Sequence, residues 1–137
     1  MRLIPMDDWR LLLNSLANVL LEGTSRAIDQ AVMVLLPHLR PPVHTCPHWT
    51  SDAVPREGTL ILRDVETLDP HEQQHLLLWL DEAGAQVQVI SLASMPLFRR
   101  VVEGHFLDAL YYRLNVLYIT GEDARSIGGA AEPPVMN

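Results

Sequence analysis

The fold is decided by residues 59–92, which read TLILRDVETLDPHEQQHLLLWLDEAGAQVQVISL. The apolar runs at 59–65 and 87–92 are typical of buried strands, because each is short and rich in Leu, Ile or Val. Between them, residues 69–84 have the signals of a helix: an Asp-Pro pair completed by Glu as a capping box, and a final Gly. A strand, a helix and a second strand in this order predict a parallel sheet that is covered by helices.

Further elements are expected where apolar residues recur at helical or strand spacing. These are a helix over 25–36, a short helix over 96–104, a helical turn up to residue 113 and a strand at 116–119. The apolar run 19–21 fits either a helix end or a strand. We therefore expect an α/β fold of three layers, α/β/α, with a short parallel sheet of about five strands. The predicted domain covers residues 1–120, and residues 121–137 are expected to form a flexible C-terminal tail.

Composition bounds the class of protein. The chain has 137 residues, 48% of them hydrophobic, which fits one globular domain. Its formal charge of −7 argues against a general nucleic-acid surface, so we expect no direct nucleic-acid contact. Cys46 is the only cysteine, which excludes an internal disulfide and fits a reducing compartment. The N-terminal residues contain neither a signal peptide nor a membrane span, so we expect a cytoplasmic protein without membrane contact.

Five segments, in the family's order along the chain, resemble the central AAA+ ATPase domain of the bacterial enhancer-binding proteins that activate sigma-54 RNA polymerase. Residues 104–116, GHFLDALYYRLNV, are similar to the family segment that carries arginines acting in trans on a neighbouring subunit. Residues 58–65, GTLILRDV, resemble the Walker B strand, and 68–94 the next helix and the sensor strand. Residues 18–32 align without a gap to the Walker A strand, loop and helix. The resemblance implies a fold like that of P-loop NTPases and AAA+ proteins, here lacking the family's helical lid.

The same resemblance implies that the nucleotide site has degenerated. A Walker A loop needs glycines and a lysine to hold phosphate, but Asp29 stands at the lysine position, and Arg26 and Ile28 at two glycine positions. A Walker B site needs a carboxylate for Mg²⁺ and another to polarise water, but Arg63 stands at the first position. The second carboxylate is shortened to Asp64. The degenerate site comprises Gly23, Thr24, Asp29, Asp64 and Ser94, the last at the position of the sensor asparagine.

These substitutions predict that the chain is not an enzyme and binds no cofactor, ATP included. We expect a non-catalytic AAA+-like domain that acts in transcription regulation through protein–protein interaction. The expected partner is a sigma-54-dependent activator or a second copy of the chain. The interface candidates are Phe106, Tyr111, Tyr112 and Arg113.

Two details of the candidate interface allow alternative interpretations. Arg113 either reaches a neighbour's nucleotide or forms an ion pair with an acidic neighbour such as Asp108 or Glu103. Leu107 replaces the family's other arginine, which weakens the first interpretation. Of the adjacent Tyr111 and Tyr112, one ring is expected to be packed and the other exposed.

Two other functions are alternatives. His71-Glu72-Gln73-Gln74-His75 matches the His-Glu-x-x-His pattern of zinc hydrolases, in which two histidines on one helix face hold zinc and the glutamate is the base. His44, Cys46 and His48, with His38 nearby, form a second candidate metal set. The remaining alternative is a regulator that still binds ATP without hydrolysing it.

Overall fold

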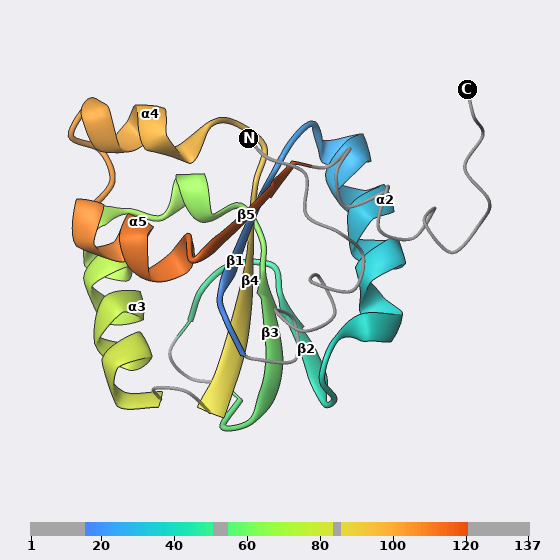
Figure 1. The fold of residues 1–137 in the computed structure, drawn as a ribbon. Helices are drawn as coiled ribbons and strands as arrows, with labels where there is room; N and C mark the ends of the chain where they lie inside the picture. Colours follow the sequence, from blue (N-terminus) through green and yellow to red (C-terminus); the bar gives the residue numbers. More distant parts are fainter. Residues whose placement is uncertain (1–15, 51–54, 84–85, 121–137) are drawn as a thin grey trace.

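A five-stranded parallel sheet forms the centre of the protein in the computed structural model, which describes residues 16–50, 55–83 and 86–120 (Figure 1). The strands are β1 (Val19–Glu22), β2 (Val43–Cys46), β3 (Gly58–Leu62), β4 (Val87–Ala93) and β5 (Leu117–Thr120). The helices are α2 (Ser25–Leu35), α3 (Pro70–Ala83), α4 (Leu97–Val102) and α5 (Asp108–Leu114), with 3-10 turns η1 (Leu36–His38) and η2 (Val65–Thr67). The expected α/β class and the parallel sheet are confirmed.

The sheet has a hydrophobic core on each face, because successive strand residues point to opposite sides. Leu20, Leu60 and Leu62 pack with α3, α4 and α5 on one face. Val19 and Ile61 pack with α2 on the other. Figure 1 shows the resulting three layers, with α2 alone on one side of the sheet. Burial on both faces explains why β1, β3 and β4 are mostly apolar and do not alternate between apolar and solvent-exposed polar residues; the polar Gln88 and Ser91 of β4 are buried too.

The strand order β2-β3-β4-β1-β5 places β1 between β4 and β5. Val19 pairs with Ile90 on one side and with Leu117 on the other. All strands are parallel, so their carboxyl ends meet at one edge of the sheet. In open α/β sheets this edge is where ligands bind, where the strand order reverses. The carboxyl ends of β1, β3 and β4 therefore position the candidate site.

The structure settles the ambiguous element at 19–21 and shortens the strand predicted at 59–65. The ambiguous run 19–21 lies within strand β1. The strand predicted over 59–65 ends at Leu62, because Asp64 adopts the left-handed conformation (φ 55°) that starts turn η2. The predicted C-terminal tail, 121–137, lies outside the described residues. Within the described ranges, no helix is long and apolar enough to cross a membrane.

Candidate functional site

The connection from β1 to α2 is short. It consists of Gly23 and Thr24, and helix α2 already begins at Ser25. Thr24 caps the helix: its Oγ1 accepts a hydrogen bond from the N–H of Ala27 at 3.1 Å. A phosphate-binding loop holds its ligand with successive backbone N–H groups of a non-helical, glycine-rich segment. Here the corresponding residues up to Asp29 lie in the helix, and Ile28 is buried in the core.

Asp29 and Arg63 form an ion pair with each other. Nη2 of Arg63 donates a hydrogen bond to Oδ1 of Asp29 at 2.8 Å, which joins the end of β3 to the second turn of α2. Both side chains are substantially exposed (35% for Arg63 and 62% for Asp29), so the pair contributes at most about 1 kcal/mol to stability. Its importance is its position, since the two charges neutralise each other where the Walker A and Walker B residues of the resemblance stand.

The ends of β3 and β4 are linked by a buried carboxylate that sequence reasoning missed. Glu66 is 7% exposed, and its Oε2 accepts a hydrogen bond from Oγ of Ser94 at 2.7 Å. Ser94, at the sensor position, is therefore engaged within the protein. Asp64 is exposed, and its carbonyl accepts hydrogen bonds from N and Oγ1 of Thr67 at 2.9 and 2.7 Å. No sequence signal marked Glu66, because an acidic residue in a turn is usually solvated.

A pocket of about 440 Å³ lies at the carboxyl ends of β1, β4 and β5. Gly23, Thr24 and Ser94 contribute to it, so three of the predicted site residues are brought together. Glu22 also lines the pocket and was not predicted from the sequence. Its carboxylate accepts hydrogen bonds from the N–H of Leu97 (2.8 Å) and from the phenol of Tyr118 (2.7 Å).

The predicted interface residues divide into buried and exposed ones. Phe106 is 4% exposed and belongs to the core beside α3, so including it in the interface was wrong. Tyr111 is also buried, whereas Tyr112 is 64% exposed, which confirms the expected division between the two rings. Burial raises the pKa of Tyr111 above its ordinary value, and a hydrogen bond from Asn115 to its oxygen opposes this shift. The packing of Phe106 could not be read from the motif, which shows identity and not orientation.

Of the two alternatives for Arg113, the structure shows the ion pair with an acidic neighbour, and the partner is Asp81 of α3 instead of Asp108 or Glu103. The pair is partly exposed and connects α5 to α3. Phe98 and Val102 of α4 and Tyr112 of α5 have exposed apolar side chains; we call these three residues the α4–α5 surface. The ring of Tyr111 lies between the two aromatic members, with its centroid 5.5 Å from that of Phe98 and 5.2 Å from that of Tyr112. Only Tyr112 was predicted from the sequence.

Gln73 fixes the segment that leads into α5. The side chain is 1% exposed, and Nε2 donates to the carbonyls of Leu68 and His105, each at 2.9 Å. Oε1 accepts from the N–H of Leu107 at 2.8 Å. The amide nitrogen and the amide oxygen of Gln73 both bond to backbone groups, so α3 holds residues 105–107 in place.

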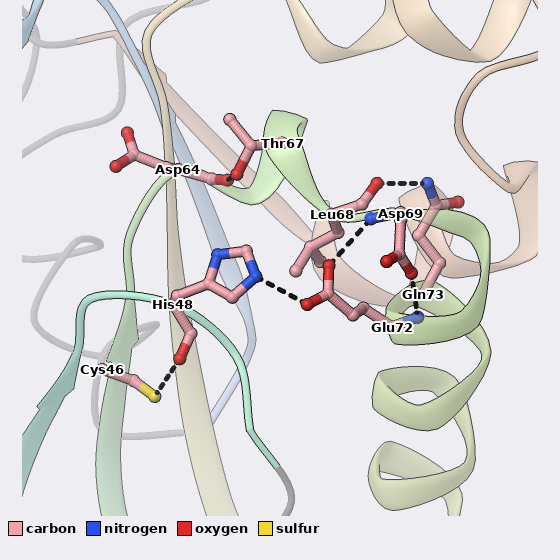
Figure 2. A network of polar contacts seen from close by, with 8 residues as sticks. All are labelled: Cys46, His48, Asp64, Thr67, Leu68, Asp69, Glu72 and Gln73. Atoms are coloured by element: carbon pink, nitrogen blue, oxygen red, sulfur yellow. Dashed lines mark hydrogen bonds and ion pairs between the residues drawn. The ribbon is translucent and has the colours of Figure 1, made fainter.

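The zinc-hydrolase pattern is used for structure instead. Figure 2 shows Glu72 between two partners: Oε2 lies 2.7 Å from Nε2 of His48, and Oε1 accepts from the N–H of Asp69 at 2.9 Å. Oδ1 of Asp69 accepts in return from the N–H of Glu72 at 2.8 Å, which completes the predicted capping box. The rings of His71 and His75 are exposed, with centroids 4.3 Å apart.

The second metal set is also dispersed. Sγ of Cys46 donates to the carbonyl of His48 at 3.0 Å, whereas His44 is exposed on strand β2. In Figure 2 the imidazole of His48 points toward Glu72 and away from the thiol. Among the residues that the structure describes, no three His, Cys, Asp or Glu side chains are placed to hold one metal ion.

Comparison with known proteins identifies the family. The sigma-54 interaction domain family matches residues 25–120. NtrX from Brucella abortus in complex with ADP aligns with a TM-score of 0.65 and 18% identity, over 84% of this chain and 35% of NtrX. Its complex with ATP aligns with a TM-score of 0.62 and 17% identity, over 83% of this chain and 35% of NtrX.

The P-loop NTPase domain of a sigma-54 transport activator from E. coli aligns with a TM-score of 0.57 and 18% identity, over 82% of this chain and 93% of that domain. At such identities these structures show the fold alone. The chain thus spans about a third of the length of NtrX. No curated protein matches the sequence. Because the family match extends over most of the chain and the fold agrees, this chain belongs to the sigma-54 interaction domain family of AAA+ proteins.

Proposed function

We propose that this chain is a non-catalytic sigma-54 interaction domain that acts in transcription regulation through protein–protein contact and neither binds nor hydrolyses ATP. The observation that carries the proposal is the ion pair between Asp29 and Arg63. In the family pattern these positions hold a lysine for phosphate and an aspartate for Mg²⁺. Here both charges are reversed, and each has its counter-ion in the protein.

Two further features support the absence of nucleotide binding. Only Gly23 and Thr24 separate β1 from helix α2, which removes the loop of free N–H groups that would surround a phosphate. Ser94 is hydrogen bonded to Glu66 and is not free to sense a ligand in the way of the family's asparagine.

The α4–α5 surface is the proposed contact area. Phe98, Val102 and Tyr112 are between 48% and 71% exposed, and aromatic side chains are typical anchors of protein interfaces. The adjacent Arg113 is held by Asp81 at the edge of this area. The proposed partner is a catalytically active sigma-54 activator, whose ring of subunits would be interrupted by a subunit without a nucleotide site.

The test is the ATPase rate of an activator AAA+ domain from the same cell, measured with increasing amounts of the full chain. We expect saturable inhibition, and Tyr112→Ala should raise the half-inhibitory concentration by about tenfold, which corresponds to about 1.4 kcal/mol. Met33→Ala is the matched control, because Met33 is 74% exposed on α2, across the sheet. An unchanged rate with every activator of that cell, together with no co-sedimentation, would contradict the proposal.

No observation favours a zinc hydrolase. Both oxygens of Glu72, the residue that would act as the base, are engaged by His48 and Asp69. The alternative function is that of a regulator that binds ATP without hydrolysing it.

A further inference from the structure

Among the described residues, the pocket at the carboxyl edge of the sheet is lined by one carboxylate, that of Glu22, and by no Lys, Arg or His. Glu22 and Tyr118 are the ionisable groups among the described residues that line it. The other lining residues are small, apolar or hydroxyl-bearing: Gly23, Thr24, Ala27, Ser94, Met95, Pro96 and Thr120. Its volume of about 440 Å³ is within the range of small-molecule sites.

The carboxylate of Glu22 is held in place without being neutralised. The residue is 9% exposed, and its two oxygens accept hydrogen bonds from neutral donors, the N–H of Leu97 and the phenol of Tyr118. No Lys, Arg or His of the described ranges forms an ion pair with it. A carboxylate removed from water is stabilised fully only when a cation accompanies its hydrogen bonds.

A second uncompensated carboxylate lies one residue away from the pocket. Glu66 is 7% exposed and bonds through Oε2 to Ser94, which lines the pocket. Its Oε1 is buried and has no hydrogen-bond partner among the described residues. Glu22 pairs in register with Ala93, the neighbour of Ser94, so the two carboxylates flank the end of β4. Two carboxylates that form no ion pair within the described residues therefore lie at this end of the sheet.

We propose that this pocket binds a small organic cation, a guanidinium or ammonium group on an apolar body. The charged group would form an ion pair with the carboxylate of Glu22, and the apolar body of the ligand would lie against Ala27, Met95 and Pro96. The amino end of α2 opposes a cation, but its effective charge is about +0.5 against the full charge of a carboxylate. The same balance disfavours phosphate. The inference is independent of any protein partner, because it depends only on the pocket.

Titration calorimetry of the full chain with butylguanidinium, compared with the neutral and nearly isosteric butylurea, tests the proposal at about 0.15 M NaCl, where surface charges are screened. We expect saturable one-to-one binding of the cation and binding of butylurea that is weaker by about tenfold or more. The substitution Glu22→Gln should weaken the binding of butylguanidinium by a similar factor. The control Glu103→Gln removes an exposed carboxylate at the end of α4 and should leave binding unchanged.

A second variant protects the test against a folding defect in Glu22→Gln. Ala27→Leu places bulk in the pocket while both carboxylates remain, and it should also reduce cation binding by about tenfold. Equal binding of butylurea, no binding of butylguanidinium, or binding unaffected by both variants would overturn the proposal. Failure here leaves the ATPase-inhibition result unchanged, and a failed inhibition assay does not affect the calorimetry.

Discussion

Replacing Gln73 by Met should destabilise the protein far more than the same change at Gln74. Met has nearly the volume of Gln but cannot replace the three hydrogen bonds that Gln73 makes with backbone groups of Leu68, His105 and Leu107. Each such bond contributes about 1 kcal/mol, and a buried group left without a partner costs about 1–3 kcal/mol. Because two of the contacts are only partly buried, we expect a loss of about 2–4 kcal/mol.

Urea unfolding followed by circular dichroism measures this loss as a lower midpoint at an unchanged slope. Heating should show a fall in Tm on the order of 10 °C. Gln74 is exposed on the same helix, so Gln74→Met should remain within about 0.5 kcal/mol of the wild type. If the two variants were equally stable, the inferred role of Gln73 in fixing residues 105–107 would be refuted.

Two further predictions concern a glycine and a tyrosine. Gly58→Ala should lose more than about 3 kcal/mol, because φ is +88° and a Cβ would lie 2.2 Å from the carbonyl oxygen of Pro42. Gly104→Ala, at φ +82° with open space around it, should lose only about 1 kcal/mol; equal losses would contradict the steric argument. The raised pKa of Tyr111 predicts stability that is intact below about pH 10 and lost as pH rises through the folded pKa. Tyr111→Phe should flatten this alkaline decline in urea titrations, and an unchanged decline would exclude Tyr111 as its source.

Much of the fold was accessible from the sequence because the sheet is buried on both faces. The sequences of β3 and β4 are mostly Leu, Ile and Val, and the capping box of Asp69 and Glu72 marked the start of α3. The end of β3 was predicted too late, since the left-handed conformation of Asp64 has no apolar signal. The resemblance to sigma-54 activator domains placed the elements in their order along the chain. Periodicity alone could not decide whether the short run 19–21 is a strand or the end of a helix.

The site was less predictable because its decisive contacts join distant residues. Glu22 looks like an ordinary end to an apolar run, and its partners Leu97 and Tyr118 are 75 and 96 residues away. The pairing of Asp29 with Arg63 likewise depends on strand order. The sequence showed each departure from the family pattern separately, but only the folded structure showed that Asp29 and Arg63 pair with each other.

The most direct test of the account is thermal unfolding of the full chain over a titration of Mg-ATP. A ligand that binds only the folded state, present at about 100 times its Kd, raises the free energy of unfolding by about 2.7 kcal/mol. Specific binding of Mg-ATP would therefore be measurable as a rise in Tm. The account predicts no change in Tm at any ATP concentration up to the millimolar range. A saturable rise in Tm with Mg-ATP would contradict it, because Asp29, Arg63 and the helical start at Ser25 would then accommodate a nucleotide after all.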